Sequence, residues 1–151
     1  MFNKIISSSD YESWVTANSP NKFSLFDYLH GVFSTRDLEP DLAIAFFKFL
    51  WPEFICVDGL VFLKEEYSKS KYKELAQQEN SERDLEYWMN LISIDGLFES
   101  ATLEQSKYFG RQLVKMWRAK LREDFSDKCF IVDCVIDGNE VYSVFYQKND
   151  L

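Results

Sequence analysis

The stretch FLWPEFICVDGLVFLKEEY, residues 49–67, contains the signal that decides the fold. Within it, two apolar runs at 54–57 and 60–63 flank the dipeptide Asp58-Gly59. Asp-Gly between such runs predicts a tight β-hairpin, because the turn that joins two twisted strands needs positive φ at both central residues. The stretch is therefore interpreted as a scaffold hairpin whose strands contribute to the core.

The last part of the chain repeats this pattern in CFIVDCVIDGNEVYSVFYQK, residues 129–148. Two strands are predicted around a second Asp-Gly, at Asp137-Gly138. Apolar residues occupy both faces of the first strand, which is typical of a central, covered strand. The two Asp-Gly hairpins together predict a small, four-stranded antiparallel sheet.

About five or six helices are expected to pack on this sheet, which makes the fold class α+β. Capping-box spacings and apolar residues three to four positions apart indicate them. Pro40 is typical of a first helical turn, and a residue before Pro52 avoids the helical region, so one helix is bounded by these prolines. The predicted helical segments are 8–18, 21–33, 40–51, 65–80, 81–94 and 102–124.

The composition is that of one globular domain, residues 1–151. The hydrophobic content of 46% is enough for a core, and the chain has no repeat and no Pro/Gly-rich linker. The aromatic content of 17% is high, so some Tyr and Trp side chains are expected at a groove or a partner interface. Cys56 is expected to be a buried, inert thiol.

The net charge of −8 argues against direct nucleic-acid binding and against binding to anionic membranes. The most apolar stretch, 42–51, is too short to span a bilayer, and the N-terminus does not resemble a secretory signal. Three scattered cysteines favour a reducing compartment. A cytoplasmic protein is the expectation.

Residues for catalysis, metal binding or cofactor binding are not predicted. His30 is the single histidine, and the three cysteines form no CxxC pair, so the spacing of a zinc site is missing. Glycine-rich phosphate loops, G-x-S-x-G and HExxH are also missing from the sequence. The adjacent pair Glu65 and Glu66 is interpreted as a solvated helix start, and the protein is not expected to be an enzyme.

Two charged features remain as candidate binding surfaces. Residues 51–100 contain eleven acidic and five basic residues, so most of the negative excess lies there. With neighbouring aromatic residues, this region predicts a docking surface for a basic protein. The candidate partner-binding residues are Glu79, Glu82, Glu86, Tyr87, Asp95 and Glu99.

The second feature is a basic stripe on the longest predicted helix. Its members follow each other at spacings of three or four: Lys107, Arg111, Lys115, Arg118 and Arg122. Such a stripe could hold phosphate or an acidic partner, and a solvated helix face opposite the core is the favoured interpretation.

Four segments carry a resemblance to a known class of proteins: LWPEFICVDGLVFL (50–63), DLEYWMNLISI (84–94), KYFGRQLVKMWRAKL (107–121) and VYSVFYQK (141–148). Their order resembles that of some bacterial immunity proteins of contact-dependent growth inhibition and related polymorphic toxin systems. The resemblance implies a small, cytoplasmic, non-enzymatic protein that binds one cognate toxin domain, often a nuclease, and blocks its active site. Interfaces vary among such proteins, so no functional residue is transferred by position.

An immunity protein that neutralises a basic toxin domain through an acidic, aromatic surface is therefore the first hypothesis. The alternative is a small-ligand-binding or regulatory module, with an apolar pocket at the helix–sheet interface around Trp51, Phe54 and Tyr142. An enzyme that uses carboxylates is placed last. Oligomeric state is not predicted.

Overall fold

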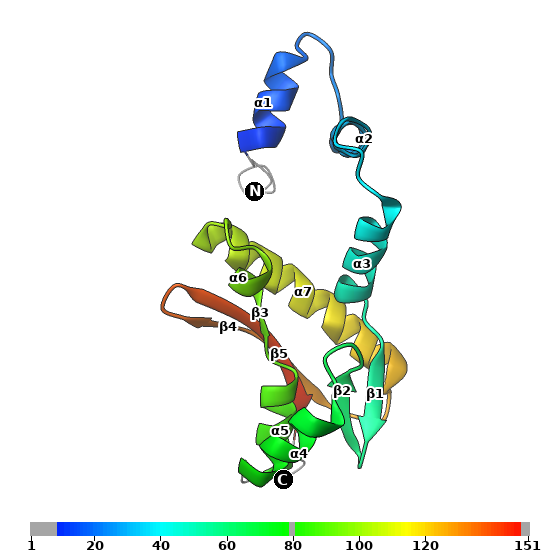
Figure 1. Ribbon diagram of the computed structural model, residues 1–151, viewed down its shortest axis with the longest axis vertical. Helices are drawn as coiled ribbons and strands as arrows, with labels where there is room; N and C mark the ends of the chain where they lie inside the picture. The colour runs from blue at the N-terminus through cyan, green and yellow to red at the C-terminus, as the bar shows by residue number, and fades with distance from the viewer. Residues whose placement is uncertain (1–8, 79–80, 149–151) are drawn as a thin grey trace. The chain divides into compact units, whose positions relative to one another are not determined.

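The computed structural model describes residues 9–78 and 81–148, and these form an α+β fold (Figure 1). They contain seven helices: α1 (Ser9–Ala17), α2 (Leu25–Thr35), α3 (Pro40–Leu50), α4 (Lys69–Gln78), α5 (Glu82–Met89), α6 (Ile94–Leu97) and α7 (Leu103–Asp124). They also contain five strands: β1 (Phe54–Val57), β2 (Leu60–Leu63), β3 (Ile92–Ser93), β4 (Phe130–Asp137) and β5 (Glu140–Gln147).

The first hairpin forms as its turn residues predict. Val57 pairs with Leu60, so Asp58 and Gly59 are the two turn residues, with φ of 53° and 83°. In the second hairpin Asp137 pairs with Glu140, so the two-residue turn is Gly138-Asn139. The predicted Asp-Gly turn is thus displaced by one residue, and Gly138 takes the positive φ of 59° at its first position.

The prediction of one four-stranded sheet is wrong. The hairpins belong to two antiparallel sheets, a two-stranded β1-β2 sheet and a three-stranded sheet in the order β3-β5-β4. The added strand β3 pairs through Ile92 and Ser93 with Ser143 and Tyr142. It makes β5 central, so β4, which was expected to be central, lies at an edge.

Side chains from α5, from its C-cap residue and from the end of β5 hold the two sheets together where strand pairing is missing. We call Glu86, Asn90 and Gln147 the polar bridge. Asn90 accepts a hydrogen bond from the backbone N–H of Leu63 at 3.0 Å and donates to the carbonyls of Val61 and Phe145, at 2.9 and 3.3 Å. These backbone groups would remain unsatisfied at strand edges without it.

The carboxylate of Glu86 completes the polar bridge. One oxygen accepts from the backbone N–H of Val61 at 2.8 Å, and the other accepts from that of Gln147 at 2.7 Å. The side-chain amide of Gln147 also donates to Glu86, at 2.7 Å. The contacts therefore join β2 to β5 through one helix, although these two strands do not pair.

The helix boundaries agree best with the predictions where a proline or a capping residue marks the end of the helix. α3 begins at Pro40, and α7 begins after Thr102, whose side chain and that of Gln105 form a capping box. α4 begins only at Lys69, because residues 64–66 form a turn, so Glu65 and Glu66 are not its start. The predicted helix 81–94 ends at Met89, since Ile92 and Ser93 pair with β5.

The contacts of the chain divide it into two units, one up to Phe46 and one from Phe47. Among the described residues, the buried hydrophobic side chains all lie in the second unit, where α7 packs on β4 and β5 and contributes Leu113, Trp117 and Leu121. In the first unit, Trp14 and Tyr28 pack ring to ring at 5.6 Å, and no described residue from 10 to 46 is buried. Cys56, expected to be buried, is exposed.

Candidate partner-binding pocket

The predicted docking residues are not all at the surface. Glu86 is only 1% exposed and belongs to the polar bridge, so it does not lie on an accessible acidic face. The sequence predicts an exposed Glu86, because an acidic side chain in a short helix is normally solvated. Glu79 lies outside the described residues.

Asp95 is half-buried and also bonded within the fold. It accepts hydrogen bonds from the Ser106 hydroxyl at 2.7 Å and the Val141 backbone N–H at 2.6 Å. These two donors hold the pKa of the Asp95 carboxyl below its ordinary value, so the folded chain favours the ionised form. Asp95 thereby ties α6 to α7 and β5.

The remaining candidates are separated along the second unit. Glu82 and Tyr87 are on α5, which packs on β2, β5 and α4, whereas exposed Glu99 follows α6, which packs on α7 and β5 (Figure 1). Tyr87 is half-buried and packs against Tyr146, with ring centroids 5.7 Å apart. The five described candidates therefore do not form one continuous surface, and partner binding by the exposed members stays a prediction.

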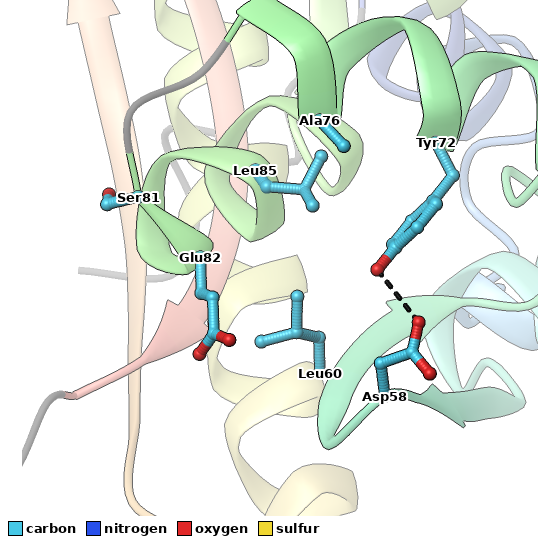
Figure 2. Close-up of a pocket in the computed structure, with 7 residues that line it drawn as sticks. All are labelled: Asp58, Leu60, Tyr72, Ala76, Ser81, Glu82 and Leu85. Carbon is cyan, nitrogen blue, oxygen red and sulfur yellow. Dashed lines mark hydrogen bonds between the residues drawn. The ribbon is translucent and has the colours of Figure 1, made fainter.

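One of them, Glu82, lines a pocket of about 290 Å³ between the β1–β2 turn, α4 and α5. We call it the acidic pocket. Figure 2 shows its lining residues, which are Asp58, Leu60, Tyr72, Ala76, Ser81, Glu82 and Leu85. The described lining includes two carboxylates and no positively charged side chain.

The acidic pocket has an ordered polar side. The Tyr72 hydroxyl donates a hydrogen bond to Asp58 at 3.1 Å (Figure 2). Burial raises the pKa of the Tyr72 phenol, and the hydrogen bond to Asp58 and the negative charges of Asp58 and Glu82 raise it further. The phenol therefore remains a protonated donor, which fixes one oxygen of Asp58 and leaves the other to accept from a ligand.

The floor of the acidic pocket is apolar. Leu60 and Leu85 are buried core residues, and in Figure 2 Asp58 and Glu82 lie on either side of Leu60. Ser81 caps α5 by accepting from the Asp84 backbone N–H at 3.1 Å. This cap positions Glu82 at the first residue of the helix. An apolar floor between two carboxylates suits a side chain with an aliphatic stem and a cationic head.

Sequence reasoning assigned no binding role to Asp58 or Tyr72. Asp58 was interpreted only as a turn residue and Tyr72 only as part of a polar helix. The sequence does contain an indication of the pocket. Tyr72, Leu75 and Ala76 share one face of α4, and an apolar helix face packs against another element of the fold. Which partner it faces depends on how α4 and α5 pack together.

The residues proposed for an apolar ligand pocket have different surroundings. Phe54 packs in the core against Phe145, with ring centroids 5.2 Å apart. The hydroxyl of Tyr142 donates to Glu140 at 2.5 Å, and the Lys120 ammonium lies 5.9 Å from the ring centre of partly exposed Trp51. A ligand pocket around these three residues stays a prediction.

Within the described residues, no group of three His, Cys, Asp or Glu side chains is arranged to hold a metal ion. None of the helices in the described part of the chain combines the length and apolar character needed to cross a membrane. Comparison of the chain with protein-family models, curated proteins and solved structures found no match.

Proposed function

We propose that this protein is a non-enzymatic, cytoplasmic immunity protein that binds and neutralises a basic toxin domain, of nuclease type. The acidic pocket is the observation that most supports this function. It offers the carboxylates of Asp58 and Glu82 above an apolar floor, and a cationic side chain of a partner has the matching chemistry. The chain's net charge of −8 favours a partner of opposite charge.

In this proposal a Lys or Arg side chain of the toxin domain enters the acidic pocket. Its stem packs on Leu60 and Leu85, and its head pairs with Asp58 and Glu82. The tyrosine hydroxyl of Tyr72 keeps Asp58 oriented before the partner arrives, which lowers the entropy lost on binding. The long-range field of the acidic chain speeds the encounter.

The first experiment uses the gene next to this one in its native genome. The adjacent product is expressed in a bacterial host with and without this protein. We expect the adjacent product to inhibit growth alone and to be neutralised by co-expression. A harmless adjacent product, or growth arrest that this protein does not relieve, contradicts the immunity function.

The second experiment tests the acidic pocket in the resulting complex. The variants Asp58→Asn and Glu82→Gln remove one charge each, and Asn tolerates the positive φ at position 58. Each is expected to weaken binding about tenfold, the effect of losing about 1.4 kcal/mol of interaction free energy. Glu123→Gln removes an exposed charge on α7, outside the lining of the acidic pocket, and is expected to retain the wild-type Kd.

Titration calorimetry measures the three Kd values, and circular dichroism confirms that each variant is folded. Equal weakening by all three variants would mean that binding depends on general acidity and not on the acidic pocket. Unchanged binding by Asp58→Asn and Glu82→Gln would exclude the pocket as the toxin site.

A further inference from the structure

A second pocket, of about 240 Å³, lies where the C-terminal part of α7 meets β4. Its lining residues are Arg118, Leu121, Arg122, Lys128, Cys129, Phe130 and Val132. We call it the cationic pocket, because its described lining carries three positive charges and no carboxylate. This concentration of positive charge is unexpected in a chain of net charge −8.

Two of the three cations are held in place by the fold. The Arg118 guanidinium donates to the Val132 carbonyl at 2.7 Å. The Lys128 ammonium donates to the Gly59 carbonyl at 3.0 Å and to the side-chain oxygen of Gln147 at 2.9 Å. Both groups retain further N–H donors, because a guanidinium has five and an ammonium has three.

Arg122 is the cation without a partner inside the described part of the fold. It lies one helical turn after Arg118, so the two guanidinium groups share a face of α7 and repel each other. No hydrogen bond or ion pair to Arg122 is formed by the residues described in 9–78 and 81–148. A bound anion would relieve this repulsion.

The carboxylates next to the cationic pocket in the sequence do not line it. Asp124 pairs with Lys120 at 2.6 Å. Asp133 follows Val132 on β4 and so faces the opposite side of the strand, where it accepts a hydrogen bond from the backbone N–H of Cys134 at 2.8 Å. Glu123 and Asp127 are exposed and are not part of the lining.

We propose that the cationic pocket binds a phosphate group, either free phosphate or the phosphate of a small monoester. Guanidinium groups match phosphate oxygens in pairs, and Lys128 adds a point charge. The pocket is smaller than the roughly 300 to 1,000 Å³ of sites for drug-sized ligands, which favours one phosphate group with a small substituent. This site is separate from the acidic pocket and does not depend on the proposed function.

Two cysteines provide a direct assay on the whole protein. Cys129 lines the cationic pocket and is exposed, while Cys56 is exposed on β1 outside it. Alkylation by iodoacetamide is followed at each site by mass spectrometry, with millimolar inorganic phosphate replacing chloride at constant ionic strength. We expect phosphate to slow the alkylation of Cys129 several-fold and to leave that of Cys56 unchanged.

A matched pair of variants separates the cationic pocket from general positive charge. Arg122→Gln is expected to raise the phosphate concentration that half-protects Cys129 about tenfold. A change of this size corresponds to the loss of one charge-assisted bidentate contact. Arg111→Gln removes a charge from the same basic stripe outside the pocket lining and is expected to leave protection within about twofold of the wild type.

Glycerol 3-phosphate, a small monoester, distinguishes the two sources of the phosphate group. Stronger protection by this ester than by inorganic phosphate supports a monoester ligand, and equal or weaker protection supports free phosphate. The proposal is overturned if phosphate does not protect Cys129, if it slows both cysteines equally, or if Arg111→Gln and Arg122→Gln weaken protection alike. The arginines would then serve only the C-terminal dipole of α7.

Discussion

At the scale of single residues, the buried carboxylate of Glu86 in the polar bridge has the clearest structural role. Both oxygens of Glu86 accept hydrogen bonds from groups that would otherwise lie unsatisfied at two strand edges. An isolated buried carboxylate is costly, but one that receives several N–H donors is stabilised by them. The position tolerates few other side chains, since a replacement must accept from both sides.

Substitution of Glu86 tests this role. Glu86→Gln keeps the shape of the side chain but turns one acceptor into an NH₂ group that faces other donors. We expect it to lower the free energy of unfolding by about 1 to 3 kcal/mol. Urea unfolding followed by tryptophan fluorescence measures the change.

Glu82→Gln is the matched control, because it removes the same charge from the exposed start of the same helix. We expect its free energy of unfolding to stay within about 0.5 kcal/mol of the wild type. Similar losses for the two variants would mean that charge, and not the hydrogen bonds of Glu86, determines the effect.

At the scale of elements, the difference between α7 and α5 shows what local sequence can predict. α7 has 22 residues, a capping box and a continuous apolar stripe, so its local signals agree along its whole length. The two residues of β3 have no such signals and were assigned to the preceding helix. Pairing with β5 overrides the helical pattern there, because it satisfies backbone groups of Ile92 and Ser93 in a ladder.

Close packing of α7 on the sheet predicts a strict size limit at Gly110. A Cβ atom there would lie 2.9 Å from Cys134 Sγ and 3.2 Å from Val141 Cγ1. Gly110→Ala is therefore expected to destabilise the protein by about 1 to 3 kcal/mol, despite the better helix propensity of alanine. Thermal unfolding followed by far-UV circular dichroism measures the lower Tm.

Gly31 in α2 gives the opposite expectation. Its added Cβ would contact Trp14 at 3.6 Å, an ordinary van der Waals distance. Gly31→Ala should therefore raise stability by up to about 1 kcal/mol through helix propensity alone. A lower Tm for both variants would show that packing on α7 is not the cause of the effect at Gly110.

At the scale of the whole molecule, burial is concentrated in one of the two units. The core residues lie between Leu60 and Phe145, and Trp117 at their centre donates its indole N–H to the Phe49 carbonyl at 3.0 Å. Residues 10–46 contribute no buried side chain. The second unit therefore contains the contacts that a stable core requires.

A fragment of residues 40–151, which retains α3, tests the independence of this core. We expect it to unfold cooperatively in urea, with a free energy of unfolding within about 1 kcal/mol of the full chain, since none of the described residues 10–39 is buried. Tryptophan fluorescence reports the transition, because unfolding exposes Trp117, which is fully buried in the native chain. A non-cooperative transition, or native fluorescence lost before urea is added, would contradict an independent core.

The sequence by itself determined the α+β class, the first hairpin and the bounds of α3 and α7, because prolines, Asp58-Gly59 and capping residues act on their immediate neighbours. Only the tertiary structure decided that the hairpins form separate sheets, that Glu86 is buried and that Asp58, Tyr72 and Glu82 line one pocket. These outcomes depend on contacts between segments distant in the chain, such as Glu86 with Gln147. A local pattern specifies which groups need partners, and the packing of the whole chain selects which partners they find.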